Sequence, residues 1–130
     1  MKRNILSLAV AAGLAGVAAT ATAQLEMHVN DKGLGEALIF PFYSAENGND
    51  TYIHVVNTTM DSKAVKIRVI EGKNSVEVLD FNLYMSPEDH FSFVITETAD
   101  GEGAMLRTAD NSCTAPAIPA EGQPFVNFQY

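Results

Sequence analysis

Apolar and polar residues alternate along three stretches in the middle of the chain. The alternation covers residues 51–57, 65–69 and 91–95, and short polar segments separate the three stretches. A period of two places every second side chain on one face of a pleated strand, so each stretch has an apolar face and a more polar face. Several such strands joined by turns predict an antiparallel sandwich or barrel.

Further strands are expected on both sides of this region. The candidates are residues 25–30, 37–43, 75–85, 104–107 and 125–130. Pro41 cannot donate a ladder hydrogen bond, which predicts a sheet edge or a bulge for its strand. The apolar phase within 75–85 changes near Leu79, which predicts a β-bulge or a strand that switches sheets.

Polar segments separate these candidates. Turns are expected at residues 31–33, 44–50, 57–62, 86–89 and 96–103, and a long proline-containing loop at 110–124. No segment after residue 23 predicts a helix. We therefore predict an all-β fold, an immunoglobulin-like antiparallel β-sandwich of about seven strands, preceded by a signal-peptide helix.

Residues 1–23 have the order of features of a secretory signal peptide. Lys2 and Arg3 are followed by an apolar stretch from Ile5 to Ala19, and the box Ala21-Thr22-Ala23 fits a cleavage site before Gln24. The apolar stretch is short for a membrane span of about 20 residues. We expect an exported protein, periplasmic, cell-surface or extracellular, with no integral membrane segment after cleavage.

The expected organisation has three parts. Residues 1–23 are the signal peptide, 24–109 the sandwich, and 110–130 a proline-containing loop with a terminal strand. An apolar strand directly after such a loop predicts that the chain continues beyond Tyr130. The alternatives are an outer-membrane barrel, which also ends in an aromatic residue, and a pilin-like domain that donates a terminal strand to a neighbour.

Composition narrows the set of partners. The formal net charge is −8, and cleavage would remove Lys2 and Arg3 and make the chain more acidic. An acidic surface repels nucleic-acid phosphates and anionic lipids, so neither is an expected partner. Cys113 is the only cysteine, and it could be a free thiol or pair outside this chain. No local motif joins it to a histidine, which disfavours a cysteine nucleophile.

Two acidic turns contain the candidate metal ligands. Glu46, Asn49 and Asp50 lie in the first turn, and Asp100 and Glu102 lie in the second. Calcium prefers several carboxylate and amide oxygens of this kind. Neither turn has the alternating Asp/Asn pattern and distal glutamate of a dedicated calcium loop, so solvated turns are the simpler interpretation. No other cofactor is expected.

Motifs for catalysis are missing from the sequence. It has no Gly-rich phosphate loop, G-x-S-x-G elbow or H-E-x-x-H helix. Asp80 interrupts an apolar strand, and its carboxylate needs a partner if it is buried. That partner could be Lys66 or Arg68 on a neighbouring strand, or backbone N–H groups at the bulge. Since no second carboxylate completes an acid/base pair, we do not expect an enzyme.

Some side chains could serve binding. Tyr52, His54 and Val56 share one face, which is either a ligand-contact surface or the second face of a covered strand. Tyr43, Tyr52 and Tyr84 could stack on sugars, although the lack of tryptophan weakens that interpretation.

Several segments resemble one group of proteins. They are GEALIFPFY at 35–43, GNDT at 48–51, VVNTT at 55–59, KAVKIR at 63–68, EGKNS at 71–75, VLDFNLY at 78–84 and SPED at 86–89. These segments resemble the N-terminal immunoglobulin-like region of exported, largely uncharacterised surface proteins of Gram-negative bacteria. The resemblance implies a sandwich at the front of a longer secreted or surface protein, and it carries no catalytic residue.

The sequence thus favours an exported, non-catalytic β-sandwich with a structural or interaction role. Its partners would be other surface or periplasmic proteins, bound through exposed edge strands. The alternative is a carbohydrate- or calcium-binding module, and a third hypothesis is a fragment of a secreted hydrolase.

Overall fold

The computed structural model describes residues 29–127, and the chain divides into two compact units, 1–38 and 39–130. The predicted signal-peptide helix lies outside the described residues. In the first unit, Asp31 to Gly33 form the expected turn, in which the Gly33 amide donates to the Asn30 carbonyl. No strand occurs at residues 29–38, and the remainder of the strand predicted at 25–30 lies outside the described part.

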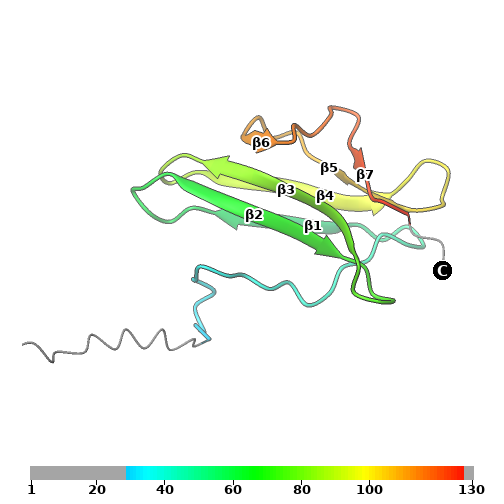
Figure 1. The fold of residues 1–130 in the computed structure, drawn as a ribbon, viewed down its shortest axis with the longest axis horizontal. Helices are drawn as coiled ribbons and strands as arrows, with labels where there is room; N and C mark the ends of the chain where they lie inside the picture. The colour runs from blue at the N-terminus through cyan, green and yellow to red at the C-terminus, as the bar shows by residue number, and fades with distance from the viewer. Residues whose placement is uncertain (1–28, 128–130) are drawn as a thin grey trace, which may run out of the picture. The chain divides into compact units, whose positions relative to one another are not determined.

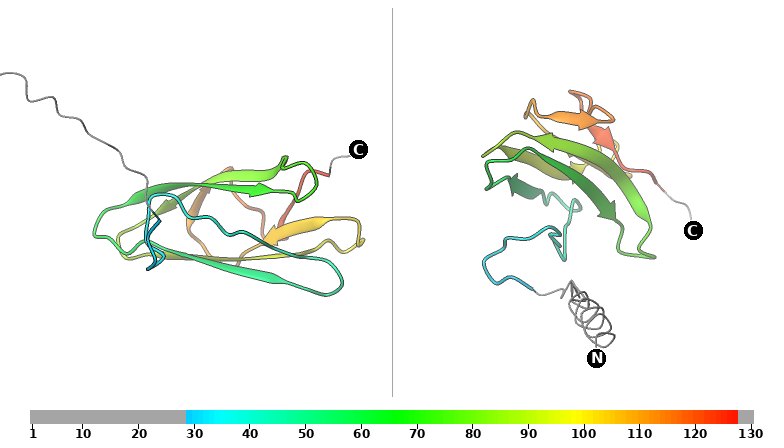
Figure 2. Two further views of the ribbon diagram at one scale, coloured as in Figure 1. Left: turned by 90° about the horizontal axis from the view of Figure 1, so that it is seen from below. Right: turned by 60° about the vertical axis from the view of Figure 1, so that its left-hand side comes forward.

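The second unit is all-β in its described part. Its strands are β1 (Thr51–Val56), β2 (Lys63–Ile70), β3 (Glu77–Met85), β4 (His90–Glu97), β5 (Ala104–Arg107), β6 (Cys113–Ala115) and β7 (Gln123–Pro124). One sheet has the order β1-β4-β5-β7 and the other the order β2-β3-β6, and every pairing is antiparallel (Figure 1). The two sheets lie one above the other as separate layers (Figure 2). The prediction of an all-β fold with about seven strands is confirmed.

The alternating pattern produces the core between the sheets. Phe81 and Leu83 of β3 and Phe91 and Ile95 of β4 are fully buried, together with Leu106 of β5. The rings of Phe81 and Phe91 meet edge to face with centroids 6.2 Å apart, a favourable aromatic geometry that joins the two sheets.

The phase change in β3 is a β-bulge, as predicted. Val69 pairs with Leu79, but the next residue, Ile70, pairs with Glu77, so Val78 has no direct partner on β2. Val78 is buried, and its carbonyl accepts a hydrogen bond from the amide of Val126. The strand stays in one sheet, and the bulge supplies a backbone acceptor for the segment after β7.

Asn57 closes one end of the sandwich. It is 5% exposed, and its amide nitrogen donates to the carbonyls of Asp61 and Ser86 while its amide oxygen accepts from Thr59. Because a buried amide is costly without partners, these bonds fix the β1–β2 connection against the β3–β4 turn.

Two expectations were wrong, and a third, the strand predicted at 125–130, is wrong for the residues that the structure describes. Residues 37–43 do not form a strand, consistent with a proline in that segment that lacks a ladder donor. Strands β6 and β7 occur within 110–124, which was expected to be loop, because neighbouring strands β3 and β5 provide the pairing that a local pattern cannot reveal. Residues 125–127 form no strand, and 128–130 lie outside the described residues.

The strand order bears on the finer fold assignment. An immunoglobulin constant domain places its first, second, fourth and fifth strands in one sheet. Counted from β1, the corresponding sheet here contains the first, fourth, fifth and seventh strands. Two stacked antiparallel sheets are therefore established, while the immunoglobulin-like assignment stays a prediction.

Candidate functional site

The five candidate calcium ligands lie at one end of the sheet that contains β1. Thr51 pairs with Ile95 and Glu97 pairs with Ala104, so the turn before β1 and the turn after β4 are at the same end. Asn47 and Gly48 both have positive φ, as a tight Asn-Gly turn requires, and the Asn49 side-chain amide donates to the Glu46 carbonyl.

The second acidic turn uses its carboxylate internally. Asp100 accepts hydrogen bonds from the Thr98 hydroxyl and the Glu102 amide, and the Thr98 bond is the main reason that the pKa of Asp100 lies below its ordinary value. Residues 29–127 contain no group of three or more His, Cys, Asp or Glu side chains arranged to hold a metal ion. The calcium hypothesis stays an untested prediction.

A hollow of about 340 Å³ lies beside Cys113. Phe91, Asp110, Ser112 and Ile118 contribute to its lining. Burial raises the pKa of Asp110, but hydrogen bonds from the Ser112 hydroxyl and amide, with other polar contacts, bring it below its ordinary value. Among residues 29–127, no histidine lines this hollow.

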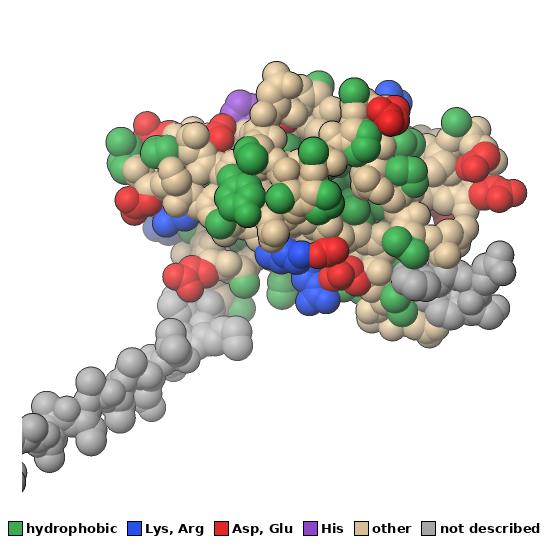
Figure 3. All heavy atoms as spheres, turned by 45° about the horizontal axis from the view of Figure 1, so that its top comes forward, with side chains coloured by type: hydrophobic (Ala, Val, Ile, Leu, Met, Phe, Trp, Pro, Cys, Tyr) green, Lys and Arg blue, Asp and Glu red, His purple; other side chains and the backbone are tan. Residues whose placement is uncertain are grey.

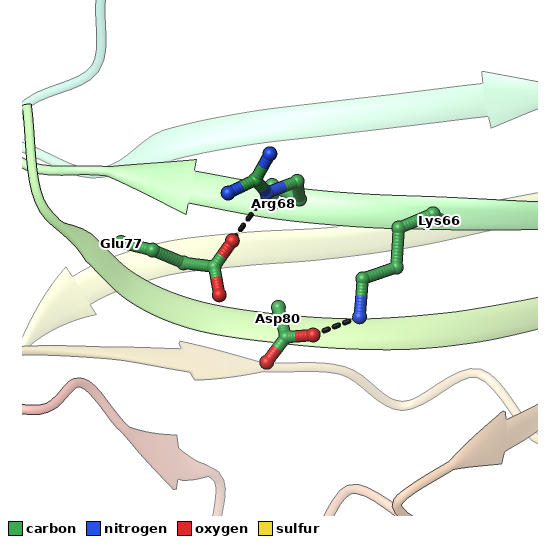
Figure 4. Close-up of polar contacts among 4 residues, drawn as sticks. All are labelled: Lys66, Arg68, Glu77 and Asp80. Atoms are coloured by element: carbon green, nitrogen blue, oxygen red, sulfur yellow. Dashed lines mark hydrogen bonds and ion pairs between the residues drawn. The ribbon is translucent and has the colours of Figure 1, made fainter.

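Charged side chains gather on the outer face of the β2-β3-β6 sheet. On the face seen in Figure 3, basic and acidic groups lie together near the middle. Lys66 pairs with Asp80 and Arg68 with Glu77, each pair joining β2 to β3 (Figure 4). Asp80 has the partner that the sequence suggested, but its side chain is half-exposed. A structural ion pair accounts for this carboxylate.

The three tyrosines do not form one stacking surface. Tyr43 is half-buried against Phe125, with ring centroids 6.2 Å apart, and burial followed by the nearby charge of Glu71 raises its pKa. Tyr52 is on β1 and Tyr84 is on β3, so they belong to different sheets. These tyrosines therefore do not lie together, and the carbohydrate-binding alternative stays a prediction.

The strand edges differ in length and in chemistry. Strands β6 and β7 are very short edges, and β2 is a long edge that carries basic residues. Short and charged edges resist pairing with other chains. Strand β1 is also an edge, six residues long, but it contains no Lys, Arg, Asp, Glu or Pro. Among the described strands it is the unprotected edge.

Side chains on the outer face of β1 are open to solvent. Tyr52 is 71% exposed and Val56 is 57% exposed. Between them, His54 forms a hydrogen bond in which its Nδ1 lies 2.8 Å from the Ser92 hydroxyl oxygen. Of the two interpretations left open by the sequence, a contact surface fits this exposure. Of the other histidines, His90 lies on the same face, opposite Val56, and His28 is outside the described residues.

A second apolar segment accompanies the β1 edge. Residues 39–45 run along the side of the sandwich formed by the free edges of β1 and β2, as Figures 1 and 2 show. Ala45 is buried in the core, whereas Ile39 is 88% exposed and Phe42 is 79% exposed. The sequence pattern predicted a strand at residues 37–43, and the exposure of Phe42 was therefore missed.

Comparisons with known proteins add no assignment. No protein-family model, curated protein or solved structure matches the chain. Within residues 29–127, no helix is long and apolar enough to cross a membrane.

Proposed function

We propose that this protein is an exported, non-catalytic β-sandwich whose β1 edge receives an extended segment of a partner protein. One observation carries the proposal. β1 is a six-residue edge strand without charge or proline, and its outward Tyr52 and Val56 are mostly exposed. Addition of a strand to such an edge is a common mode of peptide recognition, in which backbone bonds give affinity and alternate side chains give specificity.

The hydrogen-bonding phase supports this function. The Asn57 amide donates to the carbonyl of Asp89, the residue opposite it in the β1–β4 register. In an antiparallel ladder such bonded pairs alternate with unbonded pairs. The backbone groups of Tyr52, His54 and Val56 therefore point away from β4, towards the free edge, where a partner strand would bond to them.

Export is supported by the order of features at the start of the chain. Lys2 and Arg3, the following apolar stretch and the Ala21-Thr22-Ala23 box form the signal-peptide pattern. The immunoglobulin-like family assignment is a finer part of the same proposal, supported by two stacked antiparallel sheets. N-terminal sequencing of the protein recovered from periplasm and medium should give Gln24 as the first residue, and an intact Met1 would contradict export by this route.

The interaction role can be tested by photo-crosslinking in the producing cells. A photoreactive amino acid replaces Tyr52 or Val56 on β1, and Lys66 on β2 serves as the matched edge control. We expect adducts with an extended peptide of a specific protein at the two β1 positions only. Equal labelling at Lys66, or no adduct at β1, would contradict the proposed function.

A further inference from the structure

We infer that the partner strand on β1 is β1 of a second copy of this chain, paired antiparallel about a two-fold axis at His54. This inference rests on the proposed function and names the occupant of the same edge. It follows from the pairing phase of β1, from the side chains that the pairing would match, and from the distribution of charge.

The backbone of β1 is in phase for pairing with itself. In a two-fold pair centred on His54, each His54 lies opposite the other, and Tyr52 lies opposite Val56 of the second copy. These three residues are the ones whose N–H and C=O groups point to the free edge, as the Asn57 to Asp89 bond implies. All outward backbone groups of β1 would then be bonded, and a continuous sheet with β4 on both sides would result.

The side chains match in the same register. Tyr52 would face Val56 of the second copy, and an aromatic residue opposite a β-branched residue is a favourable cross-strand pair. On the core side, Ile53 would face Val55 of the second copy, and both contribute to the apolar core of their own sandwich. A central pairing of β2 with itself would instead place Lys66 opposite Arg68, which is unfavourable.

Charge favours approach along this side. The chain has a formal net charge of −8, so two copies repel each other over most orientations. Residues 39–45 and 51–60 contain no Asp, Glu, Lys or Arg. Both segments border the β1 edge, so pairing of β1 with its second copy would place no carboxylate of one strand opposite a carboxylate of the other.

The exposed aromatic groups provide contact area for the same approach. Phe40, Phe42 and Tyr52 are 52%, 79% and 71% exposed. At 150–250 Å² for each fully buried aromatic side chain, complete burial of their exposed parts sets an upper bound of roughly 400 Å² per copy, about half of the roughly 800 Å² per partner in a stable complex. Ile39, Val56 and the paired backbone add to this area.

Engineered cysteines test the register directly. In a Cys113→Ser background, His54→Cys should form a disulfide-linked dimer under mild oxidation, because opposite residues lie about 5.5 Å apart at Cα, within disulfide range. Tyr52→Cys mixed with Val56→Cys should crosslink to each other. Tyr52→Cys alone should not, since its two copies would be roughly 14 Å apart along the strand. Lys66→Cys is the control on the other long edge.

Sedimentation equilibrium of the purified protein provides the second measurement. We expect a dimer for the wild type. In Tyr52→Lys/Val56→Lys the dissociation constant should rise at least about tenfold, because charged side chains protect an edge. Circular dichroism should show that the variant stays folded. A monomer at all concentrations without crosslinks, or a dimer unaffected by these substitutions, would overturn the inference. β1 adducts with a different protein in cells would also overturn it and leave the proposed function standing, whereas no β1 adduct of any kind would refute both.

Discussion

Strands β1 and β2 follow each other in the chain and form the free edges of the two sheets on the same side of the sandwich, yet they differ in what they present to solvent. Both bury alternate apolar residues. The outward residues of β1 are Tyr52, His54 and Val56, while β2 presents Lys66 and Arg68, which pair with carboxylates on β3. Strands β1 and β2 therefore share the same pattern of buried residues, but only β1 has an edge that can accept another strand. The charged side chains of β2 resist such pairing.

The largest effect is expected from a substitution in the core that both sheets share, because both edges depend on that core. Phe81→Ala deletes a 1% exposed ring that contacts Phe91 of the opposite sheet, so we expect the free energy of unfolding to fall by about 3–5 kcal/mol. Urea denaturation measures this loss. Tyr84→Ala, on the same strand but 47% exposed, is the control and should cost clearly less. Equal losses in the two variants would contradict the assigned core.

Asn57 is the next most sensitive position, because it anchors the connection between the two edges. Asn57→Ala leaves the carbonyls of Asp61 and Ser86 without their side-chain donor, and we expect a loss of about 1–3 kcal/mol. Thermal and urea unfolding measure the change, with exposed Thr58→Ala as the control. A loss no greater than that of the control would show that the buried amide does not fix this connection.

Conversion of β2 into an edge like β1 should sharpen the comparison. Lys66→Val with Arg68→Val removes two partly exposed ion pairs, so we expect a stability change within about 1 kcal/mol. The apolar edge should instead increase concentration-dependent self-association, which light scattering measures. Lys66→Gln with Arg68→Gln separates charge from hydrophobicity. Unchanged scattering in the valine variant would mean that the basic residues do not protect β2.

The smallest effect is expected at Asp110, near the short edge β6. Its pKa lies below the ordinary 3.8, so the ionised form contributes stability above that pH, and the contribution is lost as the pH falls through the folded-state value. The melting temperature of the wild type should exceed that of Asp110→Asn more at pH 7 than at pH 3. If the difference in melting temperature between the wild type and Asp110→Asn grew as the pH was lowered, the expected pH dependence would be contradicted. Association through β1 should be unchanged in the variant.

Much of the fold could be predicted from local pattern. The alternation around Ile53 and Phe93 marked strands, and the phase change marked the bulge at Val78 to within one residue. Strands β6 and β7 were missed because they contain three and two residues, too few for a period to be visible. Residues 37–43 were predicted as a strand because they are apolar. An apolar segment can, however, pack along a sandwich without joining a sheet.

Only part of the candidate site could be predicted from the sequence. The sequence showed that Tyr52, His54 and Val56 share a face, and it offered exposed edge strands as interaction sites in general terms. It could not show that β1 is an edge, because β1 pairs with β4, more than thirty residues later in the chain, and with no other described strand. Nor could it show that the segment 39–45 runs along the same side of the sandwich.

The sequence by itself determined the all-β class, the main strands and turns, and which side chains alternate between core and solvent, because these depend on neighbours two residues apart. Only the tertiary structure decided which strands end the sheets and where uncharged segments meet. Those properties arise from pairing between residues far apart in the chain, and a local period contains no information about which strand will lie beside which. The exposed β1 edge belongs to that second group.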